Sequence, residues 1–320
     1  MIERLITFWQ EFMGPAAHPY QFVHPADQGA LAAFCANRAP FEIPGPIGEV
    51  SWAQYLANWY GDEHANRRGD LVELSLLPHP YSGSLTNASV FVLSMNGGAS
   101  DSWYRELHLD ELRRARYLAE LFQQNGPNWN QRHSGFDINN CGTSAFSYWG
   151  ERNYDLASAI ANAIGQNIGQ TYDFMAREIA TLELVAYPSR NSREITSLIP
   201  RIPPRLQRLL DTRDANTLRN IDFGAIPDWG EHALTSGVRM LAALWNELVP
   251  SALEGIKTII VTRGVRRWGF SNCWIDACPN VIVYPRQLAQ AARLGSNTPG
   301  GQAILHRLYQ RHIAQHNQGG

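Results

Sequence analysis

The sequence predicts an α/β protein of three layers, in which helices cover both faces of a central, mostly parallel, four-stranded sheet. Four short apolar runs, rich in β-branched residues, predict strands that are buried on both faces. These runs span residues 89–95, 181–186, 258–262 and 280–284. Helical patterns separate them, and strands that alternate with helices are typical of a parallel sheet.

Helices are expected at both ends of the chain and between the strands. Ile2, Leu5, Ile6 and Phe12 fall roughly on one stripe, which predicts an amphipathic N-terminal helix. Further helices are predicted at residues 30–36, 52–60, 107–122, 156–168, 172–179, 234–248 and 303–312. We therefore expect a helical N-terminal extension over residues 1–76 that packs on an α/β domain over residues 77–320.

The composition excludes a disordered chain, and the net charge gives no direct sign of nucleic-acid binding. Aromatic residues make up 11% of the chain, and the formal net charge is −2. Lys257 is the single lysine among 27 basic residues, so nearly all the positive charge is arginine. The guanidinium fork suits phosphate and carboxylate oxygens, although biased codon usage explains the same excess.

The cysteines and the hydropathy pattern indicate a cytoplasmic protein. The four cysteines are sparse and irregularly spaced, which favours reduced thiols over a disulfide framework or a metal site. The sequence contains no run of about 18 apolar residues, so we expect no membrane partner. The expected N-terminal helix carries charges within its apolar pattern and therefore differs from a signal peptide. We expect the protein to be a monomer.

Small and polar residues follow each predicted strand. Ligands of open α/β sheets bind beyond the carboxyl ends of the strands, so these segments mark the expected site. They are Asn96-Gly97-Gly98, Tyr187-Pro-Ser-Arg190, Arg263-Gly264 and Tyr284-Pro285-Arg286. Two glycines let the backbone approach a ligand and present N–H groups to it, although a tight turn would have the same sequence. The Gly-Lys-Ser/Thr ending of a phosphate-binding P-loop is missing.

These segments also carry a family resemblance. Leu77-Pro-His-Pro-Tyr-Ser-Gly83, the strand after it and Met95-Asn96-Gly97-Gly98 together resemble the first motif of the uracil-DNA glycosylase superfamily. The later strand with Glu183, the segment at residues 258–264 and Tyr284-Pro285-Arg286 are similar in order and spacing to the remaining motifs. The resemblance covers residues 77–312. The chain departs from the pattern at Gly97, which replaces a proline, and at Tyr284 and Arg286, which replace histidine and serine.

The resemblance implies a monofunctional DNA glycosylase that needs no cofactor and no metal. Such an enzyme flips its target nucleotide out of DNA, duplex or single-stranded, and hydrolyses the N-glycosidic bond to leave an abasic site. Asn96 would position the attacking water, with Asp137 as a second candidate for that role. The backbone N–H groups near Gly97 and Gly98 would bond a base carbonyl. Lys257 is poorly placed for a Schiff base, so strand cleavage is not expected.

Two positions suggest which base would be excised. Gly98 lies where uracil-specific members of the superfamily carry a bulky tyrosine, and glycine leaves the C5 side of the base open. Glu183 falls near the position of a base-reading asparagine, and an ionised carboxylate suits the N4 amino group of cytosine. The resemblance thus favours a C5-modified cytosine, such as a bulky one in phage DNA. Pairing of Glu183 with a nearby arginine is the alternative interpretation.

Aromatic and basic residues complete the expected site. Phe136 and Phe146 are candidates for stacking on the flipped base, although either could be a core residue, and Tyr284 would lie beside the base. Arginines in or after the strand-end segments are candidates for phosphate contacts. These DNA-binding candidates are Arg190, Arg263, Arg266, Arg286 and Arg293.

Three other functions remain open from the sequence. The chain could be a catalytically silent DNA-binding module that senses a modified base, which the departures at Gly97, Tyr284 and Arg286 would favour. It could act on free nucleosides or nucleotides with the same sheet. It could also be a repair enzyme that excises uracil. The sequence leaves open whether a glycosylase of this kind would act in base-excision repair or in defence against phage.

Overall fold

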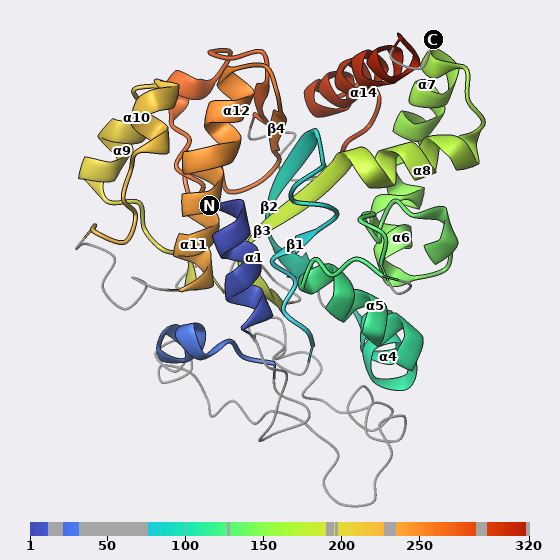
Figure 1. Cartoon of the computed structure of the whole chain (residues 1–320), viewed down its shortest axis with the longest axis horizontal. Coiled ribbons are helices and arrows are strands. Elements are labelled where there is room, and N and C mark those ends of the chain that lie inside the picture. The colour runs from blue at the N-terminus through green and yellow to red at the C-terminus, as the bar shows by residue number, and fades with distance from the viewer. Residues whose placement is uncertain are drawn as a thin grey trace, which may run out of the picture.

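The computed structural model has a five-stranded mixed sheet with the strand order β1-β3-β2-β4-β5 (Figure 1). It describes residues 1–11, 22–31, 76–98, 100–126, 129–189, 195, 198–226, 235–285 and 293–317. The strands are β1 (Tyr81–Ser82), β2 (Val90–Gly98), β3 (Ile179–Ser189), β4 (Thr258–Val261) and β5 (Val281–Val283). The last four pair in parallel, whereas β1 pairs antiparallel with β3. The α/β class is confirmed.

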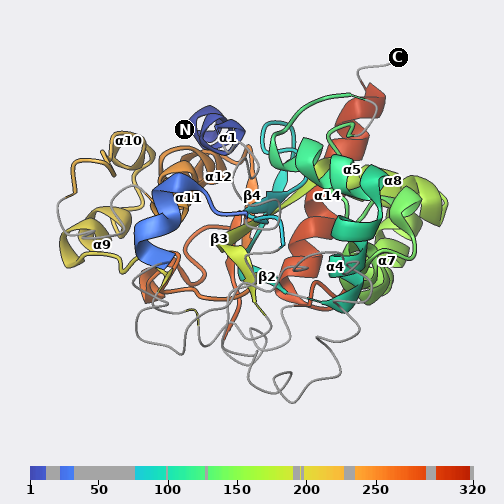
Figure 2. The ribbon, with the colours of Figure 1, turned by 90° about the horizontal axis from the view of Figure 1, so that it is seen from below.

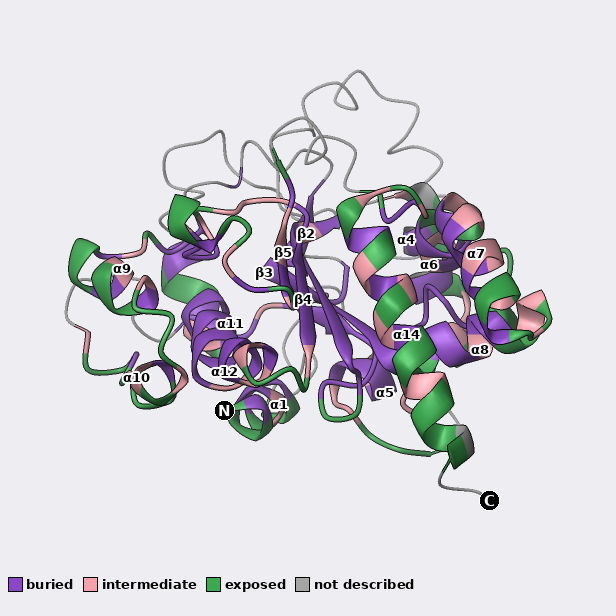
Figure 3. Cartoon of the chain, turned by 90° about the horizontal axis from the view of Figure 1, so that it is seen from above, coloured by how far each residue is buried: buried purple, intermediate pink, exposed green. Residues whose placement is uncertain are grey.

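Helices cover both faces of the sheet (Figures 2 and 3). One face carries α1 (Ile2–Gln10), α11 (Ser236–Ala243) and α12 (Val249–Leu253), with α9 (Pro204–Leu210) and α10 (Ala215–Arg219) beyond them. A π-helical turn at Leu244–Leu248 joins α11 to α12. The other face carries α6 (Ser144–Trp149), α7 (Tyr154–Ile164), α8 (Ile168–Glu178) and α14 (Pro299–Asn317).

The β1 edge of the sheet is covered by α5 (Glu111–Leu121), and α4 (Asp101–Leu109) packs against α5. The Tyr81 hydroxyl donates to the Leu121 carbonyl at 2.5 Å and ties this edge to α5. Short 3-10 helices occupy Pro25–Asp27, Ile138–Asn140, Glu151–Asn153 and Asn272–Trp274. Among the described residues, no helix is both long and apolar enough to cross a membrane.

Alternation along the strands sends polar side chains to one face near the carboxyl ends. In β2, Phe91, Leu93 and Met95 belong to the core on the α11 side, whereas Val90 and Val92 belong to the core under α7, α8 and α14. Because the side-chain period of a strand is two, Ser94 and Asn96 continue the second set. The same alternation in β3 brings Glu183 to that face, directly beside Ser94 in the register.

The N-terminal segment shares the core of the α/β domain. Leu5, Phe8 and Trp9 of α1 are buried in the same apolar cluster as the residues of α11. Asp27 accepts hydrogen bonds from the Tyr187 hydroxyl at 2.7 Å and from the Ser236 backbone N–H at 2.8 Å. One buried carboxyl group therefore links this segment to the end of β3 and to the first turn of α11.

Several expectations about individual elements are corrected. The four predicted strands match β2 to β5, but the sheet has a fifth strand, β1, whose two residues are too few to give a periodic pattern. The strand before Asn96 does not end there, because β2 continues to Gly98 with a shift in its register to β3. Helices α6, α9 and α10 were not predicted from the sequence. The helix predicted at residues 52–60 lies outside the described residues.

Gly264, in the turn after β4, should be difficult to replace. Its φ is +65°, and a Cβ atom there would overlap the Met95 sulfur. We expect Gly264→Ala to lower the free energy of unfolding by about 2–4 kcal/mol in a urea titration. Gly98→Ala is the matched control, because nothing lies within 4 Å of a Cβ atom at that position. Equal stability of the two variants would contradict this packing.

Candidate active site

A cavity of about 480 Å³ opens at the carboxyl ends of β2 and β3. Asn96, Gly97, Gly98 and Glu183 line it, so four of the residues expected at the site meet there. The remaining walls come from β1 and the segment before it, the first turn of α4, α5, the loop before α6 and α6 itself. Its place agrees with the usual ligand position in open α/β sheets.

The side-chain amide of Asn96 has a defined orientation. Nδ2 donates to the Gly97 carbonyl at 3.0 Å and to Ser189 Oγ at 2.8 Å. A backbone carbonyl can only accept, so the contact with Gly97 identifies the nitrogen and leaves Oδ1 as the accepting atom of the amide. Asn96 is partly exposed on the cavity wall, where this oxygen can orient a water molecule.

Glu183 is 5% exposed and presents an unsatisfied carboxyl oxygen. The Ser94 hydroxyl lies close enough to the carboxyl group to lower its pKa, but Oε2 has no hydrogen-bond partner in the described part of the chain. Burial raises the pKa of this group to about 8, and the Ser94 hydroxyl and the Arg263 charge offset the rise only in part. At pH 7 the neutral acid therefore predominates, in place of the carboxylate that we assumed from the sequence.

Two histidines of the cavity were not predicted. Burial lowers the pKa of His79 to about 4 and that of His133 to about 3, so both rings are neutral at pH 7. The Gly135 backbone N–H donates to His133 Nδ1 at 3.0 Å, which leaves the ring proton on Nε2. His79 lies within the motif at residues 77–83, whereas the sequence around His133 carries no spacing signal.

The buried carboxyl group of Glu120 connects three of the segments that form the cavity. Glu120 of α5 accepts hydrogen bonds from Ser82 Oγ at 2.5 Å, the Gly83 N–H at 2.7 Å and the Ser134 N–H at 3.2 Å. Burial raises the pKa of Glu120 as well. The network joins α5, β1 and the loop that carries His133, so it fixes three walls relative to one another.

The lining of the cavity combines aromatic and polar side chains and carries no full charge at neutral pH. None of its lining residues is lysine or arginine, as far as the described residues go, and its histidines and Glu183 are neutral. Buried N–H groups at His133 Nε2 and Trp103 Nε1 have no hydrogen-bond partner among the described residues. Unpaired donors of this kind cost free energy unless a water or a ligand satisfies them. The lining therefore suits an uncharged, polar ligand.

The aromatic walls differ from those expected. Trp103, Tyr148 and Trp149 line the cavity, whereas Phe136 and Phe146 are fully buried in the core beside it. Phe136 packs behind Trp149 at a ring distance of 5.9 Å, and Phe146 packs on Tyr172 at 5.3 Å. The prediction of Phe136 and Phe146 as stacking residues is therefore corrected, because their rings support the wall from behind.

Asp137 and Tyr284 do not line the cavity either. Asp137 is buried and forms an ion pair with Arg116, and it also accepts from the Asn139 backbone at 3.0 Å. Tyr284 follows β5, which β4 separates from β2, and its hydroxyl donates to the Arg293 carbonyl at 2.9 Å. Both side chains are thus committed to structural contacts outside the site.

The arginines expected to bind DNA fall into different surroundings. Arg263 lies close enough to Glu183 to influence its pKa, and Arg266 is exposed in the turn after β4. Arg293 instead pairs with Asp155 of α7 at 3.0 Å. Arg190 and Arg286 lie outside the described residues.

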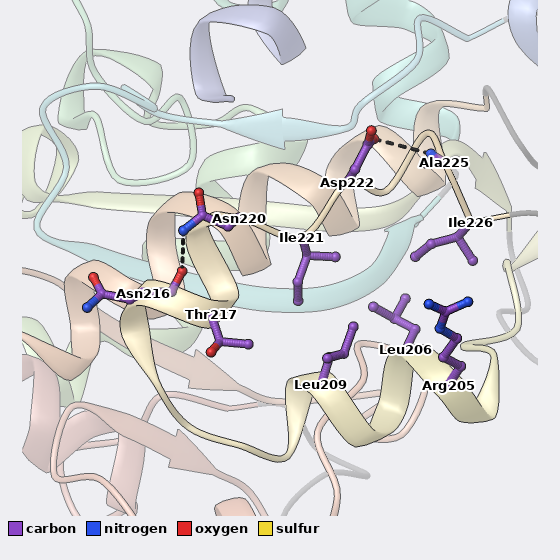
Figure 4. A pocket seen from close by; sticks show the side chains of 10 residues that line it. All are labelled: Arg205, Leu206, Leu209, Asn216, Thr217, Asn220, Ile221, Asp222, Ala225 and Ile226. Carbon is purple, nitrogen blue, oxygen red and sulfur yellow. Dashed lines mark hydrogen bonds between the residues drawn. The ribbon is translucent and has the colours of Figure 1, made fainter.

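A second cavity, of about 620 Å³, lies between α9 and the segment around α10 (Figure 4). Leu206, Leu209, Ile221 and Ile226 point toward one another across it. None of its described lining residues has a buried polar atom without a partner. Convergent polar groups within a partly apolar pocket are typical of functional sites, so the cavity at Asn96 is the better candidate.

No protein family, curated protein or solved structure gives a significant match to this chain. Within the described ranges, no group of three histidine, cysteine or acidic side chains is arranged to hold a metal ion.

Glu183→Gln should stabilise the protein at high pH. The folded state keeps the Glu183 proton up to about pH 8, whereas the unfolded chain releases it near its ordinary value of 4.5. Stability therefore falls as the pH rises through this window. We expect Glu183→Gln to exceed the wild type by about 1–4 kcal/mol at pH 9 and to match it near pH 4.5, as measured by urea unfolding.

The matched control for this stability measurement is Glu254→Gln. Glu254 is partly exposed and pairs with Arg219 at 2.6 Å, so its loss should change stability by less than about 1 kcal/mol at either pH. If both variants showed the same dependence on pH, Glu183 would not be a buried neutral acid.

Proposed function

We propose that this chain is a monofunctional DNA glycosylase that hydrolyses the N-glycosidic bond of a flipped-out modified pyrimidine. The observation that carries the proposal is the uncharged cavity that holds Asn96 and Glu183 together at the carboxyl ends of β2 and β3. A nucleobase is a neutral, flat and polar ligand, and these are the properties that the lining accommodates. A site for a free phosphate would be expected to offer arginine or lysine.

The sheet supports the proposed relationship to the uracil-DNA glycosylase superfamily. Its four parallel strands follow the order β3-β2-β4-β5, so the first and second of them along the chain are neighbours. The first-motif residues at the end of β2 and Glu183 of β3 consequently share one site. The three-layer arrangement of helices and sheet agrees with the fold that the resemblance implies.

The proposed reaction needs orientation more than a strong base. The bond from C1′ of the sugar to the base breaks, its electron pair leaves with the base, and C1′ becomes cation-like. The oxygen of a water molecule then bonds to C1′, and the water gives up a proton while the base gains one. Oδ1 of Asn96 can hold this water by accepting a hydrogen bond. An amide cannot deprotonate water, but a cationic sugar does not require hydroxide.

The walls offer contacts for the base itself. Trp103 and Trp149 are each 8% exposed and line the cavity, so an aromatic ring could stack on the flipped base. Nothing lies within 4 Å of a Cβ atom at Gly98, which leaves room for a substituent on the base. This opening supports a C5-modified cytosine as the substrate, and Arg263 and Arg266 would contact phosphates beside the cavity.

Base release from a panel of duplexes tests the proposal. The panel contains uracil, a thymine mismatch, 5-hydroxymethylcytosine and glucosylated cytosine, and alkali reveals abasic sites. We expect release from at least one modified-cytosine duplex and a loss of about 100-fold or more in Asn96→Ala. Asn216→Ala, on the exposed surface of α10, is the control and should retain the wild-type rate.

The same panel separates the proposal from the silent binding module. If wild type and Asn96→Ala bind the duplexes equally and neither releases a base, the chain senses bases without excising them. If uracil is released in preference to every modified cytosine, the proposed substrate class is wrong and a repair enzyme is indicated.

A further inference from the structure

The unpartnered oxygen of Glu183 indicates how this residue would form hydrogen bonds with a ligand. Glu183 lines the cavity, is nearly fully buried, and leaves Oε2 without a hydrogen-bond partner among the described residues. Ser94 lies directly beside Glu183 in the register of β2 and β3, and its hydroxyl is close enough to the carboxyl group to lower its pKa. The carboxyl group is thus pre-oriented, with bonding capacity left for a ligand.

We propose that Glu183 binds the base as a neutral carboxylic acid, donating one hydrogen bond and accepting another along one edge of the ring. The inference rests on the proposed function, since it names the group that would read the base in the same cavity. It predicts a ligand that carries one donor directly beside one acceptor. The N3–N4 edge of cytosine and the N3–O4 edge of uracil both meet this requirement, because the two oxygens of an acid can exchange roles.

The surroundings of Glu183 favour the neutral form. The titratable or charged groups around it are His79 before β1, Tyr117 of α5, His133 in the loop before α6 and Arg263 after β4. Both histidines are neutral at pH 7, and the phenol of Tyr117 has its pKa raised by burial. The positive charge of Arg263 lowers the pKa of Glu183 less than burial raises it.

A neutral acid also fits the chemistry better than a carboxylate would. Negative charge grows on the base as the glycosidic bond breaks, and a carboxylate against the ring would oppose that change. An O–H donor aimed at the same edge stabilises it. Ionisation of Glu183 should therefore weaken both the binding of the base and its release.

The test is the pH dependence of single-turnover base release between pH 6 and 9.5, on the best duplex of the panel. For the wild type, we expect the rate to fall about tenfold for each pH unit above about 8. In Glu183→Gln, the amide keeps one donor and one acceptor and does not titrate. We expect its rate at pH 7 to be about 3- to 10-fold lower, without the fall at high pH. Glu254→Gln should follow the wild-type profile.

Binding of free cytosine, followed by the fluorescence of the tryptophans in the cavity wall, gives a second readout over the same pH range. Affinity that weakens above about pH 8 in the wild type but not in Glu183→Gln supports the inference, even if no duplex releases a base and the proposed function fails. A wild-type profile that is flat through pH 8–9.5, or a Glu183→Gln variant that keeps the fall at high pH, overturns it. Failure of cytosine to bind at any pH, together with no base release, overturns both proposals.

Discussion

Near the carboxyl ends of β2 and β3, the Glu183 side chain lies on the face of the sheet that α6, α7, α8 and α14 cover, where a carboxylate would lose most of its hydration. The parallel register of β2 and β3 places it directly beside Ser94, and alternation along β2 brings Asn96 to the same face. The cost of burying an ion at this position keeps the carboxyl group protonated at neutral pH. A polar cavity without full charges follows from that constraint.

The rest of the fold holds this cavity in shape. The network around Glu120 joins α5, β1 and the loop of His133, so the walls cannot move independently without leaving buried polar groups unpaired. Phe136 and Phe146 pack behind the aromatic wall and restrict its rings. Cavities built in this way bind rigid, flat ligands with little loss of side-chain entropy.

Much of the fold could be predicted from apolar runs and strand ends, whereas the site could be predicted only where it lies on a strand. Asn96 and Glu183 are found in the cavity because each lies on a buried parallel strand. The alternation of such a strand determines the face on which a side chain lies, and its carboxyl end marks the edge of the sheet where ligands bind. Phe136, Phe146 and Asp137 lie in a segment without periodicity, so the sequence could not show which of them faces inward. His133 went unnoticed for the same reason, since only the folded loop brings it beside β1. Tyr284 was assigned by its place in the motif order and Arg293 because it follows a strand-end segment, but the two contact each other at the far side of β4.

We propose that a nucleobase occupies the cavity at Asn96 with one edge against Glu183. A crystal of the protein soaked with cytosine at pH 7 tests this most directly, with inorganic phosphate as the comparison ligand. We expect electron density for the ring between the aromatic wall and Glu183, within hydrogen-bond distance of Oε2, and no phosphate in the cavity. Cytosine bound at another place, or phosphate bound beside Asn96, would contradict it.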